Sequence, residues 1–360
     1  MDALLVLEDG TSERGVAFGY PGEYFGEIVF NTCITGYQEI LTDPSYQDQV
    51  IVFTYPQIGN YGVNTEDVEA SRIFPSAIVV RELSVYPSNW RAKSSLADYL
   101  RYHGKIAISE IDTRALTRHI REKGAMRCAV SARETDPAKL LKRVLSSPQM
   151  EGADLVPKVT TQRAYDMEPS NRSWNVVVFD YGVKGNILRC LKERGCKVTV
   201  VPATTPAEQV AAQKPHGVVL SNGPGDPAAL GSLIREITLL MGRVPVLGIC
   251  LGHQLLGHAL GGKTYKLKFG HRGGNQPVLH LPTRRVEITS HNHGFAVDAN
   301  SLGATVQPTY INLNDQTLEG FRCPELMVEA VQFHPEASPG PHDARHIFDD
   351  FIRMMKQFWT

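Results

Sequence analysis

The segment VLGICLGHQLL, residues 246–256, places Cys250 between Gly248 and Gly252. The apolar run before Cys250 predicts a strand, and the leucine spacing after it predicts a helix, so the cysteine lies in the turn between them. Free amides and the dipole of a helix N-terminus favour a thiolate and can bind a developing oxyanion. Cys250 could therefore be a nucleophile. A buried structural cysteine is the alternative that this segment alone leaves open.

A base and a carboxylate follow near the C-terminus, in LMVEAVQFHPEASPG. Residues 327–333 predict a strand that ends at His334-Pro335-Glu336. Proline favours extended geometry in the residue before it, and residues two apart on an extended segment face the same side. We expect Glu336 to orient His334 as the base for Cys250. Taken alone, the HPE motif is more typical of a surface turn.

Two other segments contain residue types found in oxyanion loops or in metal sites. The segment LSNGPGDPAAL, residues 220–230, predicts a loop after a buried strand, either an oxyanion loop or a plain turn. His291 and His293 in HNHG have a spacing known from metal ligands. Because we find no matching carboxylate or cysteine set near them, we predict no metal site. His253 and His258 follow Cys250 on its helix, and we interpret them as structural.

Alternating strands and helices are expected to position these residues in the second half of the chain. Because β-branched, nearly continuous apolar strands are typical of sheets covered on both faces, we predict a doubly wound, flavodoxin-like parallel α/β sheet. Ligands bind at the carboxyl ends of the strands in such folds. The strands are expected at 175–180, 197–202, 217–223 and 244–249, and the helices at 184–195, 206–215 and 230–242.

The first half of the chain predicts a smaller, mixed and β-rich domain. A polar, proline-containing stretch without a sustained period separates the halves, which is typical of a linker. We therefore predict an N-terminal domain at 1–150, a linker at 151–173 and a C-terminal domain at 174–360. Within the first domain, strands are expected at 3–10, 26–36 and 76–83, and helices at 95–104 and 112–124.

Composition excludes several classes of partner. The chain has 360 residues, with 37 basic and 38 acidic side chains. Because these charges nearly cancel, the net charge gives no reason to expect binding to nucleic acid or to an anionic membrane. No apolar stretch approaches the length of a membrane span, and the N-terminus is not typical of a secretory signal. The six cysteines contain no CxxC pair, which predicts reduced thiols and a cytoplasmic location. The absence of a GxxxxGK[ST] motif gives no reason to expect ATP binding.

The GICLGHQ, NGPGDP and HPE motifs occur in the order found in class I, triad-type glutamine amidotransferases, and the C-terminal half resembles that family. The segments at 36–62, 268–278 and 288–298 narrow the resemblance to the small subunits of carbamoyl-phosphate synthetases. The segment at 36–62 carries most weight, because other amidotransferases lack the N-terminal domain. The resemblance covers nearly the whole chain and implies the separate, bacterial-type subunit rather than the fused form.

This resemblance implies roles for individual residues. Cys250 would be the nucleophile, His334 the general base and acid, and Glu336 its orienting carboxylate. The residues implied to contact L-glutamine are Ser45, Gly223, Gly225, Leu251, Gln254, Asn292, Gly294 and Phe295. From the sequence alone, Ser45 is a turn residue after a proline.

The resemblance further implies that glutamine is hydrolysed through a cysteine thioester for carbamoyl phosphate synthesis, in arginine and pyrimidine biosynthesis. Ammonia would pass to a large ATP-dependent subunit in a heterodimer or a higher oligomer. No cofactor is expected in this chain, because ATP and Mg²⁺ would bind the large subunit. The alternatives are the glutaminase subunit of another synthase, a stand-alone γ-glutamyl hydrolase, a non-enzymatic regulatory subunit and a flavodoxin-like cofactor module.

Overall fold

The computed structural model describes residues 1–359, and the chain separates into two compact units. Unit 1 comprises Met1–Met150 together with Lys268–Gly273, and unit 2 comprises Glu151–Leu267 and the residues from Gly274 onward. Each unit has its own buried apolar clusters. Among residues 1–359, no helix has the length and apolar character needed to cross a membrane.

Unit 1 is built on a closed barrel. Its strands, in order around the barrel, are β1 (Asp2–Leu7), β2 (Ser12–Gly19), β8 (Ile106–Ser109), β6 (Ala77–Val79), β4 (Gln49–Phe53), β3 (Glu23–Asn31) and β9 (Met126–Ser131). The predicted strands at 3–10, 26–36 and 76–83 correspond to β1, β3 and β6, whereas the sequence reading missed the other four. A short parallel pair, β5 (Gln57–Ile58) and β7 (Glu82–Leu83), lies outside the barrel.

The helices of unit 1 begin and end where local sequence favours it. The Ser95 side chain accepts a hydrogen bond from the Asp98 amide, and Asp112 accepts one from Ala115, which caps the two predicted helices. Gly124, with φ of 105°, ends the second of them. The helices of this unit are α1 (Tyr37–Thr42), η1 (Pro44–Tyr46), α2 (Leu96–Tyr102), α3 (Thr113–Lys123) and α4 (Pro137–Ser146).

Unit 2 contains a ten-stranded sheet. Its order is β10 (Tyr165–Met167), β12 (Cys196–Pro202), β11 (Trp174–Asp180), β13 (Gly217–Leu220), β14 (Val246–Ile249), β19 (Val328–Val331), β18 (Leu318–Cys323), β17 (Gln307–Asn312), β15 (Thr264–His280) and β16 (Arg285–Val297). The five strands from β12 to β19 are parallel, in the predicted doubly wound order. The sequence reading missed the antiparallel extension through β18, β17, β15 and β16. The stretch 151–173 includes β10, which pairs with β12.

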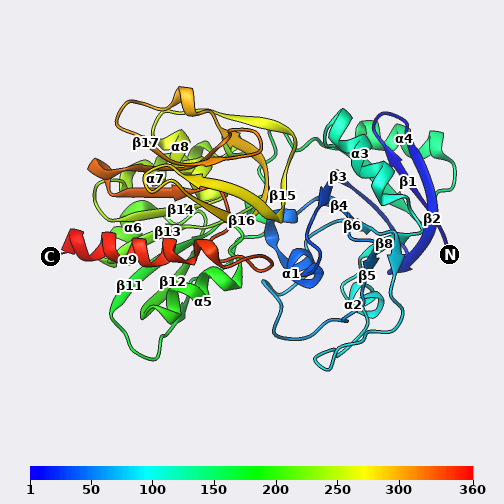
Figure 1. The fold of residues 1–360 in the computed structure, drawn as a ribbon, viewed down its shortest axis with the longest axis horizontal. Coiled ribbons are helices and arrows are strands. Elements are labelled where there is room, and N and C mark those ends of the chain that lie inside the picture. Colours follow the sequence, from blue (N-terminus) through cyan, green and yellow to red (C-terminus); the bar gives the residue numbers. More distant parts are fainter. Residues whose placement is uncertain (360) are drawn as a thin grey trace. The chain divides into compact units, whose positions relative to one another are not determined.

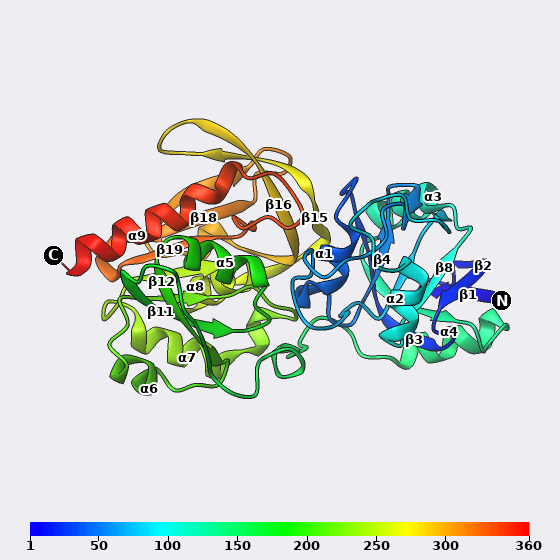
Figure 2. The same ribbon diagram turned by 90° about the horizontal axis from the view of Figure 1, so that it is seen from below.

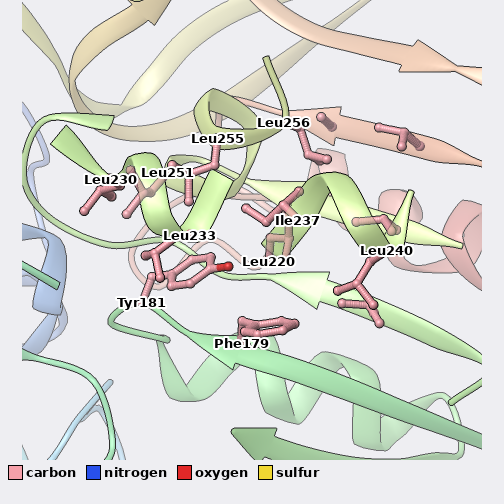
Figure 3. Packing of buried hydrophobic residues seen from close by; sticks show 14 of the residues in the cluster. Phe179, Tyr181, Leu220, Leu230, Leu233, Ile237, Leu240, Leu251, Leu255 and Leu256 are labelled. Carbon is pink, nitrogen blue, oxygen red and sulfur yellow. The ribbon is translucent and has the colours of Figure 1, made fainter. Parts of the chain in front are cut away.

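Helices cover both faces of the parallel strands (Figure 1). One face packs α5 (Gly185–Glu193) and α9 (His346–Trp359), and the other packs α6 (Ala207–Ala212), α7 (Gly231–Leu240) and α8 (Leu251–Ala259), as the turned view also shows (Figure 2). Along β11, Val176 and Val178 belong to the first core, while Val177 and Phe179 belong to the second. In Figure 3, leucines of α7 and α8 surround Leu220 and lie above Phe179. This double burial explains the continuous apolar runs.

The remaining segments of unit 2 are short 3₁₀ turns between these elements. They are η2 (Val156–Lys158), η3 (Pro227–Ala229), η4 (Ala299–Ser301), η5 (Pro324–Leu326) and η6 (Asp343–Arg345). Asp226 caps η3, because its side chain accepts a hydrogen bond from the Ala228 amide. That cap sets the conformation of the loop that follows β13 at the carboxyl edge of the sheet.

Candidate functional site

Cys250 lies at the carboxyl end of β14 and is the N-cap residue of α8. Its backbone has φ of 55° and ψ of −101°, a conformation that is rare for a residue with a side chain and indicates strain. A Cβ atom at Gly252 would lie 2.2 Å from the Leu220 carbonyl oxygen, and one at Gly248 would lie 2.5 Å from Leu256 Cδ1. Both glycines are therefore required for the close approach of α8 to the sheet. The predicted sharp turn is present.

His334 and Glu336 form a buried hydrogen-bonded pair. His334 Nδ1 donates to Glu336 Oε1 at 2.7 Å, and both side chains are almost completely excluded from solvent. The prediction that this segment stays extended is wrong, because β19 ends at Val331 and a turn follows His334. In this turn the Ala337 amide donates a hydrogen bond to the His334 carbonyl at 3.0 Å. The turn, rather than strand alternation, brings the carboxylate to the imidazole.

Lys184 completes this buried ionic group, and sequence reasoning did not identify it. Its Nζ atom lies 3.0 Å from Glu336 Oε1 and also donates to the Ala337 carbonyl. Asn186 donates from its side-chain amide to the Glu336 carbonyl, which holds the same turn. Lys184 is the N-cap residue of α5, at the carboxyl edge of the sheet. That position was the one sequence signal that could have identified it.

The charges of this group set its protonation. Burial raises the pKa of Glu336, but Lys184 and His334 outweigh it and hold that pKa below its ordinary value of 4.5. Burial lowers the pKa of His334, but the Glu336 charge and the neighbouring Cys250 raise it above 6.5. Within residues 1–359, His334 Nε2 has no hydrogen-bond partner. With Nδ1 committed to Glu336, Nε2 is the nitrogen that remains for a reactant.

The segment from Asn292 to Phe295, on β16, lies beside the cysteine turn. The Cys250 thiol donates a long hydrogen bond to the Asn292 carbonyl, with 3.6 Å between Sγ and O. Gln254 on α8 donates from Nε2 to the Phe295 carbonyl at 2.8 Å and to Gln332 Oε1 at 3.0 Å. The helix that follows the cysteine is thus tied to this strand. Gly294 lies between these contacts and is partly exposed.

The glycine loop after β13 packs against the same turn. A Cβ atom at Gly223 would lie 2.8 Å from Leu251 Cδ2 and 2.2 Å from the Tyr181 carbonyl oxygen. Gly225 has φ of 97°, and a Cβ atom there would lie 2.6 Å from the Ala153 carbonyl oxygen. The predicted loop residues and Leu251 therefore adjoin each other at the carboxyl edge of the sheet.

Ser45 is the one predicted site residue in unit 1. It is buried in η1, where its amide donates to Asp43 Oδ1 at 2.9 Å. Its contact with substrate stays a prediction. His253, interpreted as structural, is fully buried on α8 with its ring 4.7 Å from that of Phe321, and burial lowers its pKa to about 4. His258 Nε2 lies 2.9 Å from Thr264 Oγ1.

Each half of the chain matches a known protein family. Residues 177–354 match the family described as glutamine amidotransferase class-I, and residues 5–130 match the carbamoyl-phosphate synthase small chain, CPSase domain. The carbamoyl phosphate synthase small chain of Syntrophotalea carbinolica is 51% identical over 370 residues, covering 99% of this chain and 98% of the relative. That of Nitratidesulfovibrio vulgaris is 52% identical over 372 residues, covering 99% of each. The chain belongs to the carbamoyl phosphate synthase small chain family.

Membership of the carbamoyl phosphate synthase small chain family confirms the predicted resemblance and the class I amidotransferase fold of the C-terminal half. It also confirms the predicted enzyme class, the glutamine-hydrolysing carbamoyl phosphate synthases. The alternative functions are not favoured, because the match includes the N-terminal half as well as the amidotransferase domain.

Proposed function

We propose that Cys250 hydrolyses the side-chain amide of L-glutamine and that the ammonia serves a large ATP-dependent subunit in carbamoyl phosphate synthesis. One observation carries the proposal. A strained cysteine at a strand–helix turn lies next to a buried histidine whose Nδ1 is held by a carboxylate 2.7 Å away. This combination supplies a nucleophile, a base and an orienting group in one place.

In the first half-reaction, His334 Nε2 accepts the Cys250 proton, and the thiolate attacks the glutamine carboxamide carbon. The carbonyl oxygen becomes an oxyanion, for which the Leu251 amide at the start of α8 and the amides of the Gly223–Gly225 loop are suitable donors. Collapse of this intermediate breaks the C–N bond. The imidazolium proton passes to the leaving nitrogen, which departs as ammonia and leaves a glutamyl thioester.

In the second half-reaction, His334 accepts a proton from water, and the resulting hydroxide attacks the thioester carbon. The C–S bond breaks, the imidazolium returns its proton to the thiolate, and glutamate leaves. Glu336 acts through His334 in both halves, because its negative charge stabilises the imidazolium and its oxygen fixes the ring. Lys184 acts one step further away, since it keeps the Glu336 carboxylate ionised.

The amino-acid end of glutamine would bind along β16 and α8. We propose that Asn292, Gly294 and Phe295 present backbone and amide groups to it, and that Gln254 fixes this strand through the Phe295 carbonyl. Ser45 would contribute from unit 1. Residues next to the nucleophile are favoured for this role because the reacting carboxamide and the amino-acid end of glutamine are only a few bonds apart.

We propose that this chain needs no cofactor for glutamine hydrolysis, and that ATP and Mg²⁺ bind the large subunit of a heterodimer or a higher oligomer. Protonation in bulk water would destroy the nucleophilicity of ammonia, so the two subunits would share a closed passage. None of the six cysteines, all within residues 1–359, forms a disulfide, which supports a reducing, cytoplasmic location.

The test uses the assembled complex with either nitrogen source. Cys250→Ala should abolish carbamoyl phosphate synthesis from glutamine and preserve synthesis from an ammonium salt, because the mutation removes only the nitrogen supply. Cys190→Ala, a buried cysteine of the same unit on α5, is the matched control and should preserve both activities. Loss of both activities in an assembled Cys250→Ala complex would overturn the proposal, as would unchanged use of glutamine.

A further inference from the structure

Two histidines and a glutamate meet beside the strand that contains Asn292. His291 and His293 are on β16, Glu319 is on β18, and all three side chains are buried in unit 2. One nitrogen or oxygen of each lies within 4.8 Å of the others. The sequence-based prediction of no metal site rested on the lack of a nearby carboxylate. That premise is wrong, because the fold brings Glu319 to the histidine pair.

The proton on His293 is placed by a backbone carbonyl. His293 Nδ1 lies 2.8 Å from the Phe295 carbonyl oxygen. A carbonyl oxygen only accepts hydrogen bonds, so Nδ1 must bear the hydrogen. In the neutral ring, Nε2 of His293 is then the nitrogen that can accept a proton or bind a metal ion, and it lies 3.2 Å from His291 Nδ1.

The position of the proton on His291 follows from the Thr289 hydroxyl, whose single hydrogen is donated to another acceptor. Thr289 Oγ1 donates to the Gln276 carbonyl at 2.9 Å, so it can only accept from His291 Nε2, which lies 2.8 Å away. His291 therefore bears its hydrogen on Nε2. Its lone pair is on Nδ1, which faces His293 Nε2 at 3.2 Å.

Two lone pairs that face each other at this distance repel unless a proton or a metal ion lies between them. A carboxylate adds negative charge at the same point, since Glu319 Oε2 lies 3.7 Å from His291 Nδ1. The other oxygen, Oε1, accepts a hydrogen bond from Asn312 Nδ2 at 2.9 Å, which directs Oε2 to the histidines. Each of the three groups thus has a second partner that orients it, as is usual for metal ligands.

We propose that His291 Nδ1, His293 Nε2 and Glu319 Oε2 bind one divalent transition-metal ion, with Zn²⁺ as the best match. Two neutral imidazoles and a carboxylate suit this ion, and two nitrogens bound tetrahedrally at about 2.0–2.1 Å would be roughly 3.3 Å apart. The ion would stabilise β16, because the two ligands alternate along it with Asn292 and Gly294. The proposal does not depend on the catalytic roles given above.

The experiment uses the full chain with the Cys250→Ala substitution, because the thiol next to His334 is itself a possible zinc ligand. The purified protein is stripped with a chelator, equilibrated with Zn²⁺ alone and desalted, and its metal content is measured by mass spectrometry. One zinc ion per chain is expected, with a higher melting temperature than the stripped protein. Substoichiometric zinc, or zinc without effect on melting, would overturn the proposal.

Two further substitutions remove one ligand each and keep its second hydrogen bond. His293→Asn retains a donor for the Phe295 carbonyl, and His291→Gln retains one for Thr289 Oγ1. Each should weaken zinc binding by more than about 100-fold, since loss of orienting partners alone costs about 10–100-fold. His280→Asn, on β15 and outside the group, is the control and should bind zinc normally. Normal zinc binding by both ligand variants would also refute the site.

Cobalt gives a readout that needs no ligand substitution. Co²⁺ bound to the Cys250→Ala chain should produce visible absorption bands of a nitrogen and oxygen site, without a thiolate charge-transfer band. If the ligand variants fail to fold, this spectrum decides the question. The absence of visible bands at saturating Co²⁺ would mean that the two histidines share a proton instead of a metal ion.

Discussion

Replacement of Glu336 by glutamine separates its catalytic role from its structural one. Glutamine keeps the size of the side chain and can still accept a hydrogen bond from His334 Nδ1, now 2.7 Å from Oε1. It removes the negative charge that stabilises the imidazolium. A hydrogen bond to a charged group contributes about 1.5–3 kcal/mol, and each 1.4 kcal/mol is tenfold in rate, so kcat/KM should fall by roughly 10–150-fold. Loss of His334 should cost about 10²–10⁴.

The same substitution should also destabilise the fold, because it leaves Lys184 buried without its counter-charge. Lys184 is 2% exposed and its Nζ lies 3.0 Å from Glu336 Oε1. Breaking a buried ion pair on one side typically costs about 3–5 kcal/mol, whereas replacing both partners is often nearly neutral. The double variant Glu336→Gln/Lys184→Met should therefore recover most of the stability. It should not recover the rate, because the imidazolium still lacks its carboxylate.

The assay is glutamate release from glutamine, with the denaturant midpoint measured on the same preparations. Five proteins are compared: the unsubstituted chain, Glu336→Gln, Lys184→Met, the double variant and His334→Asn. A double variant that regains both stability and rate would refute the orienting role, because the slow single variant would then have been only a misfolded one. A Glu336→Gln rate equal to that of His334→Asn would contradict the division of roles between the two residues.

Three other outcomes are expected. Cys250→Ala should abolish glutamate release, whereas alanine at each of the other five cysteines should change the melting temperature at most; residual activity above a few per cent of normal would contradict the assignment. Gly252→Ala should destabilise the fold by about 1–3 kcal/mol or more in chemical denaturation, because its Cβ would lie 2.2 Å from the Leu220 carbonyl, while Gly231→Ala, with nothing within 4 Å, should not. Because the folded-state pKa of His334 is raised above 6.5 to about 10, its contribution to the free energy of unfolding should be complete below pH 6.5 and disappear as the pH rises through about 10. Denaturant titrations across this range should show that loss in the unsubstituted chain and a flatter profile in Glu336→Gln.

Much of the site could be read from the sequence, because the relevant patterns are local. The turn at Cys250 follows from an apolar run, two glycines and a helical pattern, all within a short segment. Burial on both faces of the parallel strands explains their continuous β-branched runs, and side-chain caps determine the starts of α2 and α3. Such features depend on neighbours within a few residues. They are therefore visible before the chain is folded.

Other features depend on contacts between residues far apart in the chain, and only the tertiary structure decided them. Closure of the barrel and the antiparallel extension of the sheet depend on which strands pair, which local propensity does not determine. Lys184 contacts Glu336, and Glu319 contacts His291, although the members of each pair are far apart in the sequence and belong to no common motif. Burial then gives these polar groups their effect, because charges removed from water act on each other more strongly than on solvent. The sequence thus contains the reacting groups, while the fold decides which of them share a proton or a cation.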